Sequence, residues 1–247
     1  MPKDSQYIKC LDITKTGIAD CVHCAIRKNT LFAHIEIKKH KDKLKKIFQF
    51  HYPKRSTLFN KADLAKDVFI IRKGLVKIEE VFEDGNSRIV RLINSGCVAG
   101  IETFLDNDQH YDHTAIALQD TEVCRIPYSV LMKVRNEDPP FFVDVVNEWH
   151  ENVKESDRVI ISFSTGTLKQ RVSRILIMLI DQANQEKHNE IEMLCNDDIA
   201  ALAGVTKESV SRVISDFKRK KLIIKSSPHK MIFNESALKE LSSQQYK

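Results

Sequence analysis

The sequence predicts an α+β fold in three parts: a β-rich N-terminal half, one long helix, and a C-terminal region of short helices followed by a hairpin. Three observations lead to this prediction. Short runs between residues 56 and 126 have the composition and spacing of strands in a sandwich or barrel. Apolar residues recur at steps of three and four over residues 139–163, as they do in helices. Two short helical patterns joined by a glycine occupy residues 196–219.

The N-terminal half begins with a polar leader, residues 1–28, which contains three cysteines. A helix is expected over residues 28–50, because Leu31, Ile35 and Leu44 are its candidate buried positions. Asp84-Gly85 predicts a hairpin turn, since both central residues of such a turn favour positive φ. The expected strands are residues 56–59, 68–71, 74–81, 87–93, 114–118 and 121–126.

Residues 139–163 are expected to form the long helix, which opens at Pro139-Pro140. Its apolar stripe is typical of a coiled-coil seam and favours a parallel dimer. The alternative is a helix that packs only on its own β-rich domain. A break at residues 164–166 precedes another amphipathic helix over residues 167–181. The predicted seam residues are Val145, Trp149, Val153, Ser156 and Ile160, with Val146 as the alternative to Val145.

Residues 195–212 predict two short helices joined by a tight turn. Asn196 or Asp197 is expected to cap the first helix by accepting hydrogen bonds from its free amide groups. Gly204 stands where the chain must turn, a place that often needs positive φ. Thr206 is expected to cap the second helix. This arrangement predicts a helix-turn-helix, whose second helix lies in the major groove of DNA. The alternative is an amphipathic helical hairpin with a solvated polar face. The expected buried anchors of the second helix are Val210, Val213 and Phe217.

The polar face of the second helix supplies the candidate DNA-binding residues. The basic run over residues 218–221 follows and suits contact with phosphates. Residues 222–225 and 231–233 then flank a turn, which predicts a β-hairpin wing. The candidate DNA-binding residues are Thr206, Lys207, Glu208, Ser209, Ser211 and Arg212.

The run Thr206-Lys207-Glu208-Ser209-Val210-Ser211-Arg212 resembles the recognition helix of the CRP/FNR superfamily of bacterial regulators, in particular its FNR-like branch. The resemblance implies a transcription regulator that reads palindromes with TTGA half-sites and recruits RNA polymerase. The chemistry agrees, because an arginine binds guanine through O6 and N7 and a glutamate accepts from cytosine N4. A palindrome needs two recognition helices one helical turn apart, which favours the homodimer. By the same resemblance, the Asp84-Gly85 hairpin is the expected polymerase contact.

The runs over residues 58–63 and 68–78 resemble the β-roll shared by cyclic-nucleotide-binding and CRP/FNR sensor domains, although Ala62 stands where the family usually has glycine. Members that bind cyclic nucleotides use a Gly-Glu pair on the ribose and an Arg-Ser pair on the phosphate. Here Ile101 falls at the glutamate, with Glu102 one residue off, and Tyr111-Asp112 falls at the Arg-Ser pair. An aspartate would repel the phosphate. These departures argue against cyclic AMP (cAMP) as the ligand and against a non-transcriptional cyclic-nucleotide effector.

Cys21-x-x-Cys24, together with Cys124, resembles the iron–sulfur site of FNR. The resemblance implies a [4Fe-4S] cluster as cofactor, and such a cluster normally has four cysteine ligands. The family's further cysteine, six residues after the second, is replaced here by Thr30. Cys10 in the leader is the candidate for the fourth thiolate, and the alternative fourth ligands are His23, His34 or a water, which would give a more labile cluster. The predicted signal is therefore oxygen, redox state or nitric oxide.

Other roles for the cysteines stay open. A zinc site would use the same Cys-x-x-Cys with two further ligands, and a thiol switch would need only two of Cys10, Cys21 and Cys24. The cysteines could also have no role, and the signal could be a small ligand other than cAMP. Cys97 and Cys195 are expected to be small buried apolar residues. A haem would need a histidine, and the candidates by type are His34, His40, His51, His110 and His113.

The 247-residue chain has a net charge of +5 and no N-terminal segment like a signal peptide. Its longest apolar runs are too short for a bilayer. A cytoplasmic protein with reduced cysteines is therefore expected, with DNA, RNA polymerase and a second copy as partners and no membrane. The sequence shows no catalytic triad, phosphate-binding loop or paired carboxylates, so an enzyme is not expected. The expected divisions are a cysteine-containing leader (1–28), a β-roll sensor domain (29–138), a dimerisation helix (139–163) and a winged helix-turn-helix domain (164–247).

Overall fold

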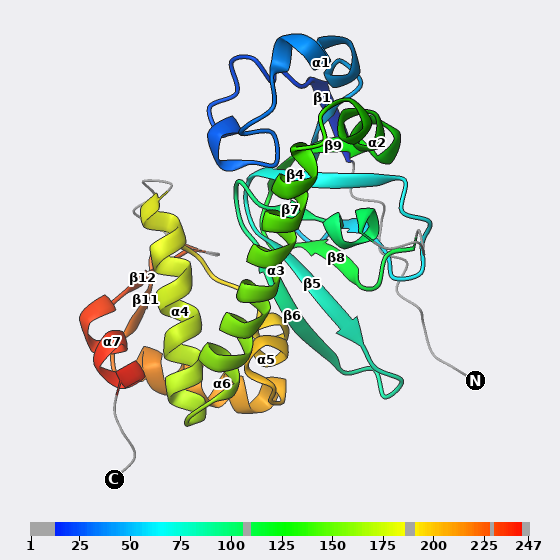
Figure 1. Ribbon diagram of the computed structural model, residues 1–247. Coiled ribbons are helices and arrows are strands. Elements are labelled where there is room, and N and C mark those ends of the chain that lie inside the picture. Colours follow the sequence, from blue (N-terminus) through cyan, green and yellow to red (C-terminus); the bar gives the residue numbers. More distant parts are fainter. Residues whose placement is uncertain (1–12, 106–109, 186–190, 228–229, 244–247) are drawn as a thin grey trace. The chain divides into compact units, whose positions relative to one another are not determined.

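The computed structural model describes residues 13–105, 110–185, 191–227 and 230–243. Its internal contacts divide the chain into two compact units. The N-terminal unit comprises residues 1–79 and 91–154, and the C-terminal unit comprises residues 80–90 and 155–247. Strands dominate the first unit and helices the second (Figure 1). The predicted α+β class is confirmed.

Two antiparallel sheets form the N-terminal unit, as the short, closely spaced strands predict, although residues 80–90 of the β5–β6 hairpin are grouped with the C-terminal unit. Strands β4 and β9 form the middle of the larger sheet, where Val68, Ile70, Val123 and Ile126 are buried. The larger sheet contains, in order, β1 (Thr14–Ile18), β2 (Phe48–Tyr52), β9 (Thr121–Pro127), β4 (Asp67–Lys73) and β7 (Val98–Ala99). The smaller contains β3 (Thr57–Phe59), β8 (Thr114–Ala117), β5 (Val76–Val81) and β6 (Ser87–Ile93).

The prediction of one helix over residues 28–50 is wrong. Only a 3-10 turn, η1 (Arg27–Asn29), and a short helix, α1 (Ile37–Leu44), form there, and residues 48–52 become strand β2. Pairing explains the difference, because β2 lies between β1 and β9 and binds both. Phe48, Phe50 and Tyr52 are aromatic residues at alternate positions, a pattern that suits a strand. The sequence did not predict β1, or the helix α2 (Tyr128–Glu137) after β9.

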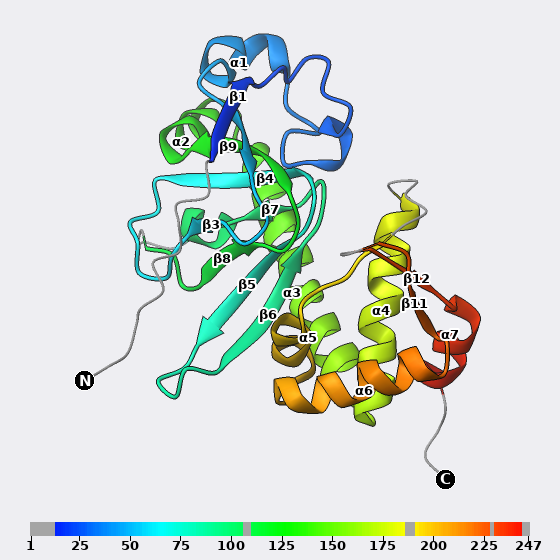
Figure 2. The ribbon, with the colours of Figure 1, turned by 180° about the vertical axis from the view of Figure 1, so that it is seen from behind.

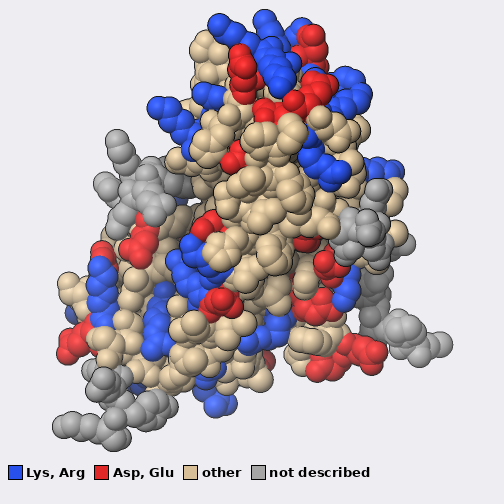
Figure 3. Space-filling model, viewed as in Figure 1, with Lys and Arg blue, Asp and Glu red and all other residues tan. Residues whose placement is uncertain are grey.

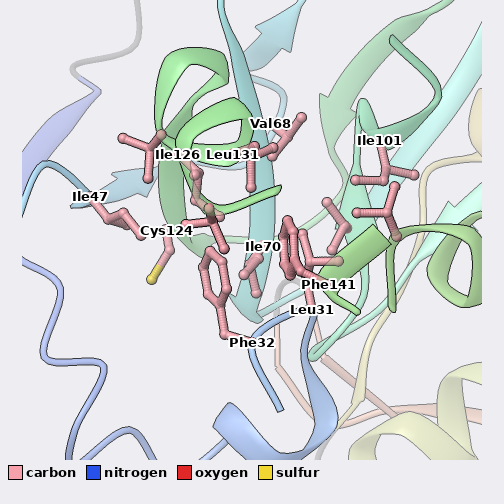
Figure 4. Close-up of a cluster of buried hydrophobic side chains, with 14 of the residues drawn as sticks. Leu31, Phe32, Ile47, Val68, Ile70, Ile101, Cys124, Ile126, Leu131 and Phe141 are labelled. Atoms are coloured by element: carbon pink, nitrogen blue, oxygen red, sulfur yellow. The ribbon is translucent and has the colours of Figure 1, made fainter. Parts of the chain in front are cut away.

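One apolar core joins the larger sheet to its helices (Figure 4). Phe32, from the loop before α1, stacks on Phe141, the first residue of α3 (Phe141–Ser164), with ring centroids 6.0 Å apart. Cys124 of β9 and Ile70 of β4 belong to the same cluster. The core therefore connects the cysteine-containing segment, the sheet and the start of the long helix. A further 3-10 turn, η2 (Ile101–Phe104), adds two more buried apolar side chains.

The C-terminal unit packs helices around a small antiparallel sheet (Figure 2). Val172, Ile175, Leu176 and Leu179 of α4 are buried, as their helical spacing predicts. The predicted wing forms between β11 and β12, and the sequence did not predict β10 or α7. The elements are α4 (Leu168–Gln185), β10 (Ile191–Glu192), α5 (Asn196–Ala203), α6 (Lys207–Arg219), β11 (Ile223–Lys225), β12 (Lys230–Phe233) and α7 (Glu235–Ser243).

Candidate functional site

Helices α5 and α6 form the predicted helix-turn-helix. Gly204 ends α5 with φ 64°, a left-handed conformation that glycine adopts without a Cβ clash. Leu202 of α5 and Val210 of α6 are fully buried, and Phe217 of α6 is only 1% exposed. The two helices therefore share one core, and the opposite face of α6 stays in solvent.

The two helix caps differ in how well the sequence predicted them. Thr206 caps α6 as expected, because its hydroxyl accepts from the Ser209 amide at 3.4 Å. The prediction that Asn196 or Asp197 caps α5 is wrong. Cys195 is the cap: its sulfur accepts from the Asp198 amide at 3.4 Å, and its thiol donates to the Asp198 carboxylate at 2.9 Å. A cap residue needs an extended backbone, and Cys195 has it (φ −69°, ψ 160°) whereas Asn196 is already helical. Cys195 is thus a half-buried polar cap and not only an apolar filler.

The polar face of α6 divides into residues with internal partners and residues without them. Lys207 pairs with Asp197 at 2.9 Å, and this contact raises the pKa of the lysine. The Ser209 hydroxyl lies 3.1 Å from that of Thr206, within the cap. Within the described part of the chain, Glu208, Ser211 and Arg212 make no hydrogen bond or ion pair, and all three are exposed. These three side chains are therefore available to a partner.

Cations gather beside the C-terminal end of α6. Asp216 binds Lys169 of α4 at 2.9 Å, Arg219 at 2.6 Å and Lys220 at 3.2 Å. Lys169 and Arg219 hold the pKa of Asp216 well below its usual range. One carboxylate thus holds three cations together, which leaves the cluster with net positive charge on the surface of the C-terminal unit.

Helix α3 has two apolar faces with different surroundings. Val145 is fully buried in the core of the N-terminal unit with Phe141, so its predicted place on an exposed seam is wrong. Val146, one position further round the helix, is exposed instead. Trp149 is 43% exposed, and Ser156 is half-buried. The visible surface over the N-terminal part of α3 is mostly free of charged side chains, whereas charged residues of both signs gather around α1 (Figure 3). The exposed apolar residues of α3 are Phe142, Val143, Val146, Trp149, Val153, Ile160 and Ile161.

The structure brings three of the four predicted metal-binding cysteines to one small cavity. Cys21, Cys24 and Cys124 line a space of about 20 Å³, and Thr30 lies in the same wall. Burial raises the pKa of Cys21 to about 12, and it also raises the pKa of Cys124. The fourth candidate, Cys10, lies outside the described residues. The remaining lining residues are Ile26, Arg27, Phe32, Ile47 and Ile70.

Comparison with known proteins identifies the family. Residues 49–138 match the cyclic nucleotide-binding domain family, and residues 170–241 match the Crp-like helix-turn-helix domain family. Together the two matches span about two thirds of the chain. The chain belongs to the CRP/FNR superfamily. It is a DNA-binding transcription regulator and not an enzyme.

Superfamily relatives match over most of their length and of this chain. The fumarate and nitrate reduction regulatory protein of Vibrio cholerae is 25% identical over 206 residues, which cover 81% of this chain and 82% of the relative. Transcriptional regulator SdrP of Thermus thermophilus is 27% identical over 174 residues, 70% of this chain and 82% of the relative. The structure of FixK2 from Bradyrhizobium japonicum shares the fold, with a TM-score of 0.66 and 20% identity over 81% of this chain and 99% of FixK2.

In this CRP/FNR member, the positions expected to bind a cyclic nucleotide carry core residues. The Tyr111 ring stacks on Phe59 with centroids 3.9 Å apart, and its hydroxyl donates to the Asp67 carbonyl. Ile101 is fully buried. Glu102, the neighbouring acid, lies 3.8 Å from Arg91. Cyclic AMP therefore stays disfavoured, because Ile101 offers no acceptor to the ribose and Tyr111 offers no positive charge to the phosphate.

Sequence reasoning missed two groups of polar residues in this regulator. Asp216 was predictable in part, because Arg219 and Lys220 follow at helical spacing, but Lys169 comes from another helix. Glu148 and Asn152 of α3 bind β7, and no sequence signal places β7 beside them. No helix in the described ranges is long and apolar enough to cross a membrane.

Proposed function

We propose that this CRP/FNR regulator binds palindromic TTGA-type sites as a homodimer and reads them through Glu208, Ser211 and Arg212. One observation carries the proposal: these three side chains are exposed on α6 and free of hydrogen bonds and ion pairs with the other described residues. An unpaired guanidinium can bind guanine at two atoms, and an unpaired carboxylate can accept from cytosine. Lys207 and Ser209 belong to the predicted set as well, but their internal contacts assign them to holding α6.

Binding to a set of palindromes tests this assignment. Each half-site is changed one base at a time, and dissociation constants are measured at fixed salt. Arg212→Ala should cost about 1–3 kcal/mol and should relax base choice at its guanine alone. Lys218→Ala is the matched control, because loss of a phosphate contact should weaken all sequences equally. Unchanged discrimination at every base in Arg212→Ala would remove Arg212 from the reading set.

The dimer is proposed to form through the exposed apolar side of α3. Phe142, Val146, Trp149, Val153 and Ile160 recur at steps of three and four along it, with one wider step between the last two. An apolar stripe of this length on a helix is expected to be covered by a partner. A second copy is the partner that a palindrome requires. Trp149→Glu should shift the protein to monomer in sedimentation, with Asp157→Glu as a control on the same helix.

The signal is proposed to act at Cys21, Cys24 and Cys124 through an iron–sulfur cluster, which supplies a group sensitive to oxygen and nitric oxide. The donor chemistry fits, because three thiols share an apolar wall. Among the described residues, no three potential ligands converge on one point for a single metal ion. A structural zinc ion needs four ligands and a [4Fe-4S] cluster normally has four cysteines, so either would need a ligand beyond these three thiols.

Space sets a condition on this cofactor. A cavity of about 20 Å³ holds about one water molecule. The loop of residues 21–30 must therefore open to admit a cluster. We assign the fourth thiolate to Cys10, because Thr30 replaces the family's cysteine. Burial raises the pKa of Cys21 and of Cys124, which disfavours a simple thiol switch and would equally have to be overcome when these thiols bind a metal.

Anaerobic purification tests the cofactor directly. Absorption, iron, sulfide and zinc are measured per chain before and after exposure to air. About four irons and a band that bleaches in air would support the cluster, and Cys10→Ser should then lower the iron content. Colourless protein that takes up no iron on reconstitution would reject the cluster, and zinc in that sample would reassign the thiols.

We propose RNA polymerase as a further partner, because the resemblance to CRP/FNR regulators implies it. A regulator that acts on DNA and RNA polymerase is proposed to work in the cytoplasm. The Asp84-Gly85 hairpin between β5 and β6 is the proposed polymerase contact. The Asp84 side chain accepts from the Asn86 amide at 2.9 Å, which stabilises the turn.

A further inference from the structure

Helix α3 is fixed to the N-terminal unit by two side chains that bind the backbone of one residue. Glu148 accepts a hydrogen bond from the Val98 amide at 2.8 Å, and the Asn152 side chain donates to the Val98 carbonyl at 3.2 Å. Val98 belongs to β7, the last strand of the larger sheet, so these groups lie at a free sheet edge. The helix completes the hydrogen bonding of the strand in place of a neighbouring strand.

Val98 also lies in one row with Cys124. Cys124 of β9 is opposite Ile70 of β4, and Ile70 is opposite Val98 of β7. Opposite residues in antiparallel strands place their side chains on the same face, and these three share one buried cluster. Cys124 and Ile70 line the cysteine cavity. The row therefore connects the cavity wall to the two backbone groups that α3 binds.

We propose that Glu148 and Asn152 form a latch through which the cysteine cavity controls the docking of α3 and hence dimerisation. This inference rests on the proposed cysteine site and the proposed α3 dimer. A group larger than the cavity must displace the cavity walls, because packed interiors transmit volume changes. A shift of Ile70 moves Val98, and both latch bonds depend on the position of that one residue.

The chemistry of the latch makes it sensitive to small shifts. Asn152 is 3% exposed, so a shift of Val98 would weaken a hydrogen bond inside the protein, where water cannot replace it. Burial raises the pKa of Glu148 to about 7, the Val98 amide opposes this shift, and the nearby carboxylate of Glu151 adds to it. A buried carboxylate held by one backbone donor is expected to release when that donor moves.

The test compares three variants of α3 in the full chain. Glu148→Leu removes the oxygen that accepts from the Val98 amide. Glu148→Gln keeps an accepting oxygen there, so its dimer dissociation constant should respond as in wild type. Glu151→Leu is the matched control, because Glu151 lies on the same helix but pairs at the surface with Lys154. The dimer dissociation constant is measured by sedimentation before and after anaerobic reconstitution with iron and sulfide, and the iron content is measured for each sample.

Wild type and Glu151→Leu should change their dimer dissociation constant by about fivefold or more on reconstitution. Glu148→Leu should bind the same amount of iron and change by about twofold or less. A full response in Glu148→Leu at full iron content would overturn the latch.

A second measurement needs no bound cluster. Hydrogen exchange of the peptide containing Val98 is compared in apo wild type, Glu148→Leu and Cys124→Ala. Exchange should rise in Glu148→Leu because the Val98 amide loses its acceptor. It should also rise in Cys124→Ala, which removes a buried sulfur at the other end of the row. Unchanged exchange in Cys124→Ala would overturn the proposal. If wild type binds no iron but Cys124→Ala still loosens Val98, the cofactor proposal fails and the latch stands.

Discussion

The helix-turn-helix and the cysteine cavity are built in opposite ways. Residues 195–219 supply the caps, turn, anchors and reading side chains of the first. The second combines a leader loop with residues from β4 and β9. The first depends on helical periodicity within one segment, and the second depends on how strands far apart in sequence pair. Local substitutions should therefore affect the helix-turn-helix alone, whereas changes near the cavity should reach α3.

The largest expected effect is on the local side of this comparison. Phe217 is 1% exposed and anchors α6 in the core of the C-terminal unit. Phe217→Ala should cost about 3–5 kcal/mol through lost burial and the cavity left behind. Hydrogen exchange should increase in α5 and α6 and stay unchanged in β4 and β9. Ser215→Ala, an exposed position on the same helix, is the control. Equal loosening of β4 and β9 would show that the two regions are not separable.

The next effect concerns Glu148, on the cavity side. Its folded pKa of about 7 is above the usual value of 4.5 because burial disfavours the charged form. Between these pH values the folded protein binds more protons than the unfolded protein, so stability falls as pH rises from about 4.5 to about 7. The loss should be on the order of 2 kcal/mol, discounted for partial solvent contact.

Denaturant unfolding across that pH window measures this loss. Glu148→Gln does not titrate, so its stability curve should be flatter than that of wild type by the same amount. Glu151→Gln is the control for loss of a nearby carboxylate, and it should keep most of the wild-type slope because burial, and not Glu151, is the main cause of the raised pKa of Glu148. A wild-type slope in Glu148→Gln would assign the pH dependence to another group.

The same contrast explains what could be predicted from the sequence. The turn at Gly204, the Thr206 cap and the anchors of α6 follow local rules, and each was predicted. The strand β2 was mistaken for helix because its pairing with β1 and β9 overrides local spacing. Val145 was placed on the wrong side of α3 because both of its faces are apolar. Periodicity cannot then tell the side that meets the core from the exposed side.

The candidate site shows the same limit. Cys21 and Cys24 are recognisable by spacing, but their proximity to Cys124 depends on the position of β9 within the sheet. Glu148 and Asn152 look like ordinary polar residues of an amphipathic helix. Their link to the cysteine cavity depends on Val98, which strand pairing aligns with Ile70 and Cys124. That alignment is set by strand register, which the sequence alone does not give.

A smaller effect is expected at the cap of α5. Cys195→Ala removes the acceptor for the Asp198 amide and should cost about 1 kcal/mol. Cys195→Ser keeps a short polar cap and should match or exceed wild-type stability, because serine is a preferred cap. Thermal unfolding of both variants provides the comparison. Equal stability of the alanine and serine variants would mean that the thiol does not stabilise α5.

The smallest effect is expected where the cysteine loop meets the start of α3. The His34 ring nitrogen lies 2.8 Å from an Asp144 oxygen, but the histidine side chain is 78% exposed. His34→Ala should cost about 0.5 kcal/mol or less, as is typical of exposed pairs. Asp144 still stabilises α3 in this variant, because an acidic residue in the first turn interacts favourably with the helix dipole.

The buried stack of Phe32 on Phe141 also remains in His34→Ala. The dimer dissociation constant should therefore stay within about twofold of wild type before and after reconstitution with iron and sulfide. A larger change would move the connection between cavity and helix from Val98 to the first turn of α3. His34→Ala and Glu148→Leu together thus distinguish a connection through strand register from one through the cysteine loop itself.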